Sequence, residues 1–315
     1  MTYLRDHHLQ QAVDLPAVEA ALASRAHPFW LDVTPAGEET AKWLGQHFPF
    51  HPLTLEDLLQ PNIRPKLEEY EGYLFLVIHS VALADGGLAP EEVECFLGRD
   101  YLVTVHTEAG EAVSRVERLV VAGPDELGHG PDRVLYLLLN EVAERYFAVA
   151  DHVDETIDAL EAEVLTGPER RVLDGVFDLR RTIVTTRRLS SHLRDALNAL
   201  ITHEGVYVRR GNAPYLRDVH NMMVTIHELV DNQRDLTSGI LEVHLSTVSN
   251  RLSGVMKRLT VVANIFLPIS FVAGLFGTNF TLMPFDNVVW FALFVACLIL
   301  APLSMLYWFW RLGWL

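Results

Sequence analysis

The sequence has few cysteines and few basic residues. Two cysteines among 315 residues do not provide the disulfide framework of small secreted proteins. Lysine and arginine number 25 against 41 aspartates and glutamates, and the net charge of −16 excludes nucleic acid as a partner, because its phosphates would repel the chain. The sequence also contains no phosphate-binding loop, paired zinc motif or nucleophile elbow. We therefore expect neither an enzyme nor an organic cofactor, whereas cations are compatible partners.

The C-terminal tail almost lacks charge. From Leu259 to Trp310 the only formally charged residue is Asp286. It lies between two uncharged segments of 18 and 23 residues, Leu259–Phe276 and Val288–Trp310. Since the hydrocarbon core of a bilayer is about 30 Å thick and is spanned by about 20 helical residues, both segments are predicted to cross a membrane. The alternative is a buried helical hairpin of a soluble protein, which would need a large core to cover both segments.

Basic residues flank the two predicted spans on one side only. Lys257 and Arg258 precede the first span, Arg311 follows the second, and the connecting segment 277–287 has no basic residue. By the positive-inside rule, both ends of the chain are expected in the cytoplasm. The first residues lack the apolar stretch of a cleaved signal peptide. We therefore predict a multi-pass protein of the cell (inner) membrane, with the lipid bilayer as a partner.

Residues 1–125 have the pattern of a cytoplasmic α/β domain. Branched and aromatic residues concentrate in four short runs, which predicts strands, and two amphipathic segments predict helices packed on the sheet. The last two strands are predicted to form a hairpin through residues 98–100. The predicted strands are Phe29–Val33, Tyr73–Ala84, Val93–Leu97 and Tyr101–His106, and the predicted helices are Ala36–His47 and Glu111–Val121.

Residues 126–258 are predicted to form a cytoplasmic helical domain and a stalk. An apolar stripe at residues 153, 157, 160 and 164, followed by an arginine-rich helix, indicates an antiparallel helical hairpin. Asn212 is placed to cap a third helix, with Pro214 in its first turn. Proline is then absent until Pro268, which permits one helix of more than 50 residues that enters the first span. The predicted fold is an α+β N-terminal domain, a long-helix stalk and two transmembrane helices within residues 259–315.

The segment that enters the membrane carries a stripe of small, hydroxyl and apolar side chains at helical spacing. Such a stripe either packs against lipid and other helices or lines a pore. Because two spans do not enclose a path by themselves, a pore requires several copies of the chain around an axis. The candidate pore-lining residues are Ser253, Met256, Leu259, Ala263, Leu267, Ser270 and Gly274.

The end of the first span resembles a family signature. Ala273-Gly-Leu-Phe-Gly-Thr-Asn-Phe280, followed by Met283-Pro284, is similar to the signature that closes the first transmembrane helix of CorA-type divalent-cation channels. Five further segments resemble the same family, so the resemblance extends over residues 53–315. These segments are Leu53–Asp57 and Arg64–Lys66 in the N-terminal domain, Tyr215–His220 at the start of the stalk, and Val243–Asn250 and Met256–Thr260 near the membrane.

The resemblance implies a funnel-shaped homopentamer that admits Mg²⁺, and often Co²⁺ or Ni²⁺, driven by the membrane potential. It assigns the selectivity filter to Gly277, Thr278 and Asn279. A ring of Asn279 amide oxygens would hydrogen-bond the water shell of Mg²⁺, which the ion loses reluctantly. The resemblance also places a hydrophobic constriction at Met256 and Leu259, where dewetting would close the pore.

The resemblance further implies a regulatory site between subunits, at which cytoplasmic Mg²⁺ holds the pore shut. Glu56 and Asp57 match one side of this site, and Asp218 matches the other. Carboxylates that face each other from two chains repel unless a cation lies between them. Mg²⁺ is therefore expected both as the transported ion and as a regulatory ion.

One residue of the signature departs from the family pattern. Thr278 stands where magnesium channels of this type usually have methionine, and zinc-transporting relatives also vary this residue. A Zn²⁺ transporter on the same scaffold, similar to ZntB, therefore stays open as an alternative, as does a membrane-anchored relative that conducts nothing. His220, His227 and Asp231 have helical spacing and are candidate ligands for Zn²⁺, with a polar stalk face as the other interpretation.

Overall fold

The computed structural model describes residues 2–5, 8–11, 28–62, 64–84, 87–107, 110–123, 126–164, 169–278 and 287–314. The chain divides into two compact units, Met1–Ile240 and Leu241–Leu315, which we call the N-terminal unit and the C-terminal unit. Helix α7 (Ala213–Phe276) contributes residues to both units. Each unit is described by itself.

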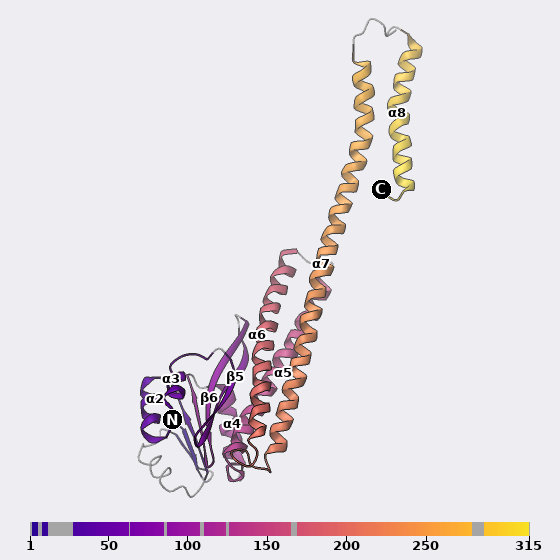
Figure 1. Cartoon of the computed structure of the whole chain (residues 1–315). Helices are drawn as coiled ribbons and strands as arrows, with labels where there is room; N and C mark the ends of the chain where they lie inside the picture. The colour runs from indigo at the N-terminus through magenta and orange to yellow at the C-terminus, as the bar shows by residue number, and fades with distance from the viewer. Residues whose placement is uncertain are drawn as a thin grey trace. The chain divides into compact units, whose positions relative to one another are not determined.

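A seven-stranded sheet forms one part of the N-terminal unit (Figure 1), with the strand order β2-β1-β3-β7-β6-β5-β4. Strands β3 and β7 are parallel, whereas the other neighbouring strands are antiparallel. Strand β4 lies at one edge of the sheet. The strands are β1 (Thr2–Arg5), β2 (His8–Gln11), β3 (Phe29–Val33), β4 (Lys66–Tyr70), β5 (Tyr73–Ala84), β6 (Gly87–Gly98) and β7 (Tyr101–His106).

The two faces of the sheet are covered by different helices, because successive side chains of a strand point to opposite faces. On one face, Phe75 belongs to a core with Leu44 of α2 (Glu38–His47) and with residues that flank α3 (Pro52–Asp57). On the other face, Leu76 belongs to a larger core that includes residues of α4 (Glu111–Ala122), α5 (Pro131–Glu163), α6 (Glu169–Thr202) and α7. Figure 1 shows α2 and α3 on one side of the sheet and α4, α5 and α6 on the other.

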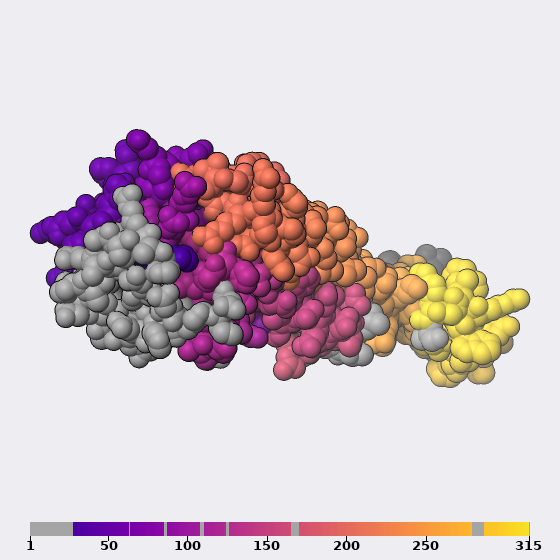
Figure 2. Space-filling model, turned by 90° about the horizontal axis from the view of Figure 1, so that it is seen from below, coloured from indigo at the N-terminus to yellow at the C-terminus, as the bar shows by residue number. Residues whose placement is uncertain are grey.

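The helical part of the N-terminal unit confirms the predicted hairpin and the predicted long helix. The apolar stripe on α5 is buried, since Val153, Ile157, Leu160 and Val164 are at most 6% exposed. Helix α7 is 64 residues long. In Figure 2 the orange part of α7 lies against the magenta helices with which it shares its core. A 3-10 turn, Leu127–His129, precedes α5.

Asn212, directly before α7, connects the start of this helix to the start of α5. Its side-chain amide donates to Asp132 Oδ2 at 2.7 Å and to the carbonyl of His129 at 3.2 Å. Asp132 is fully buried and also accepts a 2.8 Å hydrogen bond from the backbone N–H of Arg209. The predicted capping residue therefore stabilises the helix through a contact between elements as well as through its place at the helix end.

The C-terminal unit contains the end of α7 and helix α8 (Val288–Arg311). Both helices are long and apolar enough to cross a membrane. Helix α7 ends at Phe276 with the first predicted span, and α8 covers the second predicted span and one further residue. Asn287 caps α8, since its side chain accepts a 2.9 Å hydrogen bond from the backbone N–H of Val289. The rings of Phe276 and Phe294 lie 4.6 Å apart and connect the two helices.

Candidate functional site

The membrane-spanning part of α7 has two distinguishable faces. Val261, Ile265, Ile269, Val272 and Phe276 follow one another at spacings of four, four, three and four residues and are buried or half-buried. The last of them, Phe276, packs near Phe294 of α8, so this face of α7 is the one toward α8. Because each residue turns a helix by about 100°, the predicted stripe lies on the opposite side. Its seven residues are all exposed within the C-terminal unit: Ser253, Met256, Leu259, Ala263, Leu267, Ser270 and Gly274.

Exposure alone does not separate this stripe from a surface that meets lipid. Met256 and Leu259, the predicted constriction, are 54% and 61% exposed. Phe271, which lies beside the stripe, is 69% exposed. The position opposite α8 is thus the feature that distinguishes the stripe, and its pore-lining role stays a prediction.

Two members of the predicted filter, Gly277 and Thr278, close the last turn of α7. The Gly277 backbone N–H donates to the Ala273 carbonyl at 2.9 Å, and the Thr278 hydroxyl donates to the Leu275 carbonyl at 2.6 Å. A Cβ atom on Gly277 would lie 3.1 Å from the Ala273 carbonyl oxygen, so a larger residue would crowd this turn. Asn279, the third member, lies outside the described residues.

Helix α3 carries two of the predicted regulatory acids and is anchored to the sheet. The hydroxyl of the buried Tyr73 accepts a 2.9 Å hydrogen bond from the His51 backbone N–H and lies 3.1 Å from the buried Thr54 hydroxyl. These contacts fix the start of the helix. At its end, Glu56 is exposed and Asp57 is half-buried.

Asp57 is paired with a lysine of the neighbouring edge strand. Lys66 Nζ lies 2.6 Å from Asp57 Oδ2 and 3.0 Å from Glu68 Oε1. The hydroxyl of Tyr70 donates to the other Glu68 oxygen at 2.9 Å, and the Phe75 ring centroid lies 5.4 Å from the ammonium. We call these five residues the Lys66 cluster.

The contacts of the Lys66 cluster keep the lysine charged at physiological pH. Burial lowers the pKa of Lys66, but its hydrogen bonds to Asp57 and Glu68 outweigh burial, and the pKa is raised above its ordinary value. Burial, together with the hydrogen bond to Glu68, raises the pKa of Tyr70 to about 12. Lys66 is therefore a cation and Tyr70 is neutral at pH 7.

Asp218, the third predicted regulatory acid, is exposed near the start of α7. In the same region, the rings of Tyr136 and Tyr215 lie 5.2 Å apart, and the Arg133 guanidinium lies 4.8 and 4.4 Å from their centroids and pairs with Glu126 at 2.7 Å. The pKa of Tyr136 is raised above its ordinary value, chiefly by burial. Arg133 opposes this rise, whereas the nearby Asp218 carboxylate adds to it.

One chain does not assemble the predicted regulatory acids into a metal site. Within the described ranges, no group of three or more His, Cys, Asp or Glu side chains is arranged to hold a metal ion. The acids themselves suit Mg²⁺, which prefers oxygen ligands and retains several waters. Glu56, Asp57 and Asp218 would therefore need a second copy of the chain to share one ion.

The histidine candidates on α7 do not form a free ligand set. Asp231 is hydrogen-bonded to Arg187 of α6, which lowers the pKa of the aspartate. His227 Nε2 lies 3.8 Å from Asp231 Oδ2, and burial lowers the pKa of His227. Because the Asp231 charge is already neutralised by Arg187, these contacts favour a polar stalk face over a Zn²⁺ site.

Comparison with known proteins decides the family. Residues 25–312 match the family described as CorA-like Mg²⁺ transporter protein. The chain belongs to the CorA family. It is 33% identical to the candidate metal ion transporter YfjQ of Bacillus subtilis over 91% of this chain and 89% of the relative. It is also 33% identical to the cobalt/magnesium transport protein CorA of Thermotoga maritima, over 85% of this chain and 78% of the relative.

The fold agrees with this family. The complete structure of the CorA magnesium transporter of Methanocaldococcus jannaschii matches with a TM-score of 0.84 at 20% identity, covering 98% of this chain and 95% of that one. CorA-family proteins are divalent-cation transporters and not enzymes. The chain is accordingly a membrane protein with two C-terminal spans.

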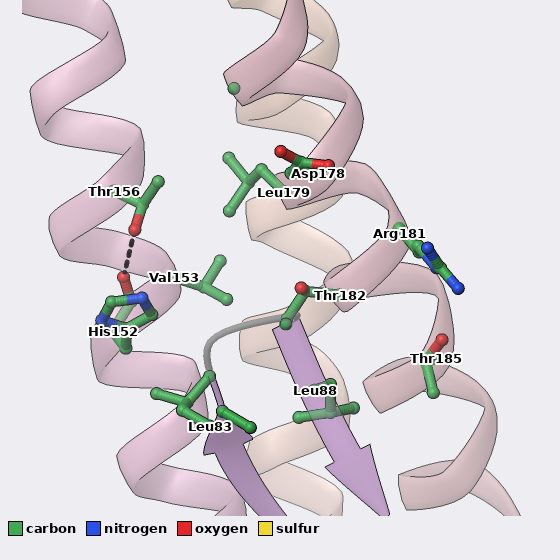
Figure 3. Close-up of a pocket in the computed structure, with 13 residues that line it drawn as sticks. Leu83, Leu88, His152, Val153, Thr156, Asp178, Leu179, Arg181, Thr182 and Thr185 are labelled. Atoms are coloured by element: carbon green, nitrogen blue, oxygen red, sulfur yellow. Dashed lines mark hydrogen bonds between the residues drawn. The ribbon is translucent and has the colours of Figure 1, made fainter.

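The N-terminal unit also contains a cavity of about 820 Å³ between the end of the β5–β6 hairpin and helices α5 and α6 (Figure 3). Leu83 and Leu88 line it from the hairpin, and Thr182 lines it from α6. On α5, the Thr156 hydroxyl donates to the His152 carbonyl at 2.8 Å. Sequence analysis did not identify this cavity, because its lining comes from four elements that share no motif. None of the residues predicted for the CorA pore or its regulation lines it.

Proposed function

We propose that this CorA-family protein is a channel for Mg²⁺, and also for Co²⁺ or Ni²⁺, formed by five copies of the chain. The observation that carries the proposal is the two-faced span of α7, in which the stripe lies opposite the face that packs toward α8. An arrangement with α7 around an axis and α8 outside it would expose the stripe to the ions and α8 to lipid. The name of the Thermotoga maritima relative, which specifies cobalt and magnesium, supports the choice of ions.

The membrane potential supplies the driving force in this proposal. Moving one elementary charge across 100 mV is worth about 2.3 kcal/mol, so a divalent cation gains about 4.6 kcal/mol on entry. This energy is sufficient for uptake without ATP.

Selection takes place at Gly277, Thr278 and Asn279. Rings of neutral amide oxygens hold the hydrated ion less tightly than carboxylates would, which lets it leave toward the constriction. Gly274, Ser270, Leu267 and Ala263 line the path below the filter, and Leu259, Met256 and Ser253 line its inner end. Closure occurs where Met256 and Leu259 exclude water.

Regulation occurs between neighbouring subunits. Glu56 and Asp57 of one subunit and Asp218 of the next would share a Mg²⁺ ion and its waters, which stabilises the closed pore. The location of these acids on the surface of the N-terminal unit supports this role, as does the net charge of −16, which attracts cations.

Zn²⁺ is the second candidate ion, and Thr278 is the observation that favours it. A hydroxyl in the middle of the signature changes the chemistry next to the proposed amide ring. The Arg187–Asp231 pair removes the support that the α7 histidines would have given to zinc.

The test is ion uptake into liposomes that contain the purified protein. With an inside-negative potential, we expect accumulation of Mg²⁺, and competition by Co²⁺, Ni²⁺ and Zn²⁺ added in turn orders the ions. Asn279→Ala should abolish uptake. Asn264→Ala is the matched control, because Asn264 is an asparagine of α7 that lies about 100° away from the stripe position Ala263. Normal Mg²⁺ uptake by the Asn279 variant would refute the proposed role of Asn279 in the filter. Zinc uptake in excess Mg²⁺ would favour the second candidate ion. Absence of flux for any of the ions would favour a non-conducting protein.

A further inference from the structure

We propose that Lys66 acts as an internal counter-cation at Asp57, which weakens the binding of the regulatory divalent ion and raises the cytoplasmic Mg²⁺ concentration needed for closure. This inference rests on the proposed regulatory role of Asp57. It assigns a new role to a residue that supplies no metal ligand, since the ammonium group of lysine has only donors.

The position of the ammonium group is built into the sheet. Lys66, Glu68 and Tyr70 alternate along β4 and therefore point to the same face, toward α3 and Phe75. Tyr70 holds one oxygen of Glu68, and the other oxygen holds the ammonium at 3.0 Å. Lys66 Nζ is thereby directed at Asp57 Oδ2, 2.6 Å away.

This geometry places a positive charge where the regulatory cation would bind. The pair is only partly screened by solvent, since the side chains of Lys66 and Asp57 are 27% and 31% exposed. A divalent ion that binds Asp57 must either tolerate the ammonium beside it or displace it toward Glu68. Both routes reduce the affinity, because the carboxylate has already gained its electrostatic stabilisation from Lys66.

The effect is specific to one of the three regulatory acids. Among the described residues, Lys66 is the cation paired with Asp57, whereas Glu56 and Asp218 form no ion pair. Lys66 is therefore expected to act through Asp57 alone. A variant that removes the Asp57 charge should also remove the influence of Lys66.

The experiment measures Mg²⁺ binding to the full-length protein in detergent by isothermal titration, together with the Mg²⁺ concentration that half-closes the channel in liposomes. We expect Lys66→Met to lower the dissociation constant for Mg²⁺ and the half-closing Mg²⁺ concentration about fivefold each. A change of this size is within the range for the loss of a partly exposed ion pair. Lys66→Arg should leave them near those of the unmodified protein, because the charge is retained. Lys42→Met is the matched control, since Lys42 is an exposed lysine of α2 and the charge change is the same.

The double variant Asp57→Asn with Lys66→Met should bind Mg²⁺ no more tightly than Asp57→Asn alone. Unchanged or weaker binding in Lys66→Met, with Asp57→Asn still impaired in binding and closure, would overturn the inference and leave the proposed function intact. If Asp57→Asn changed neither binding nor closure, the regulatory assignment itself would fail and the inference with it. Lys66→Gln repeats the measurement with a polar side chain, so that a folding defect of the methionine variant does not decide the result.

Discussion

Glu94 is predicted to make the stability of the N-terminal unit fall as the pH rises. Its side chain is 4% exposed and lies between Val77 on β5 and Val105 on β7, its neighbours in the register of the sheet. Burial, followed by the nearby carboxylate of Glu92, raises the pKa of Glu94 to about 9 from an ordinary value of 4.5. The carboxyl group is therefore protonated at pH 7.

The direction of this pH dependence follows from the number of protons that the folded and the unfolded chain bind. Between pH 4.5 and about 9 the folded chain holds a proton on Glu94 that the unfolded chain has released. The free energy of unfolding must then decrease as the pH rises, by at most about 1.4 kcal/mol per pH unit. For a unit of this size, each kcal/mol corresponds to about 2–4 °C in melting temperature, so we expect a decrease of at most about 6–11 °C between pH 6 and pH 8 from this group.

The assay is thermal unfolding of the full-length protein in detergent over that pH range. Glu94→Gln keeps the size and the hydrogen-bonding capacity of the side chain but does not titrate, so its melting temperature should lose this pH dependence. Glu71→Gln, at an exposed acid in the turn between β4 and β5, should retain it. Equal pH slopes for the unmodified protein and Glu94→Gln would refute the reasoning.

Three further outcomes are expected. Tyr73→Phe leaves the backbone N–H of His51, at the start of α3, without its partner. The free energy of unfolding should therefore fall by about 1–3 kcal/mol in denaturation measurements. Tyr307→Phe, at a side chain that is 62% exposed, should have no such effect. Asp218→Asn should raise the Mg²⁺ concentration that half-closes the channel in liposomes, and equal values for this variant and the exposed control Asp235→Asn would exclude Asp218 from regulation. Thr278→Met restores the usual residue of the signature and should increase the preference for Mg²⁺ over Zn²⁺ in competition uptake; an unchanged preference would show that this position does not select the ion.

Apolar runs made parts of the fold predictable. Strands β3, β5 and β7 were predicted with the bounds that the structure has, because their branched and aromatic residues are buried in the two cores of the sheet. The hairpin through residues 98–100 is confirmed by the pairing of Leu97 with Leu102. The long helix α7 was predictable because proline is absent between its first turn and Pro268.

Strand β4 and the first half of β6 were not predicted, because hydrogen bonding to a neighbouring strand, and not an apolar composition, makes these segments strands. Strand β4 reads Lys-Leu-Glu-Glu-Tyr and has the polar composition of an edge strand. The first half of β6 contains Pro90 and two acids, yet it pairs with β5 as far as Gly87. Its partner strand extends it beyond the apolar segment Val93–Leu97, from which it was predicted.

The candidate site divides in the same way. Gly277 belongs to the signature and Asp57 to the N-terminal segment Leu53–Asp57, and both were identified because each segment resembles the family as a continuous stretch of sequence. The Asp57–Lys66 pair was not found, because nine residues and a change from helix to strand separate its members. A contact of this kind depends on the register of β4 against β5, which composition does not specify.

The two faces of α7 connect the sequence pattern to assembly. The stripe was selected by small and hydroxyl side chains at helical spacing, whereas the opposite face is identified by its burial toward α8, and the two criteria are independent. In a ring of identical chains, the side chains nearest the axis have the least room, which favours Gly274, Ser270 and Ala263 there and directs Phe271 toward a neighbouring helix or lipid. The wide part of such a pore is therefore lined by the smallest residues of the stripe, and its narrow part by Met256 and Leu259.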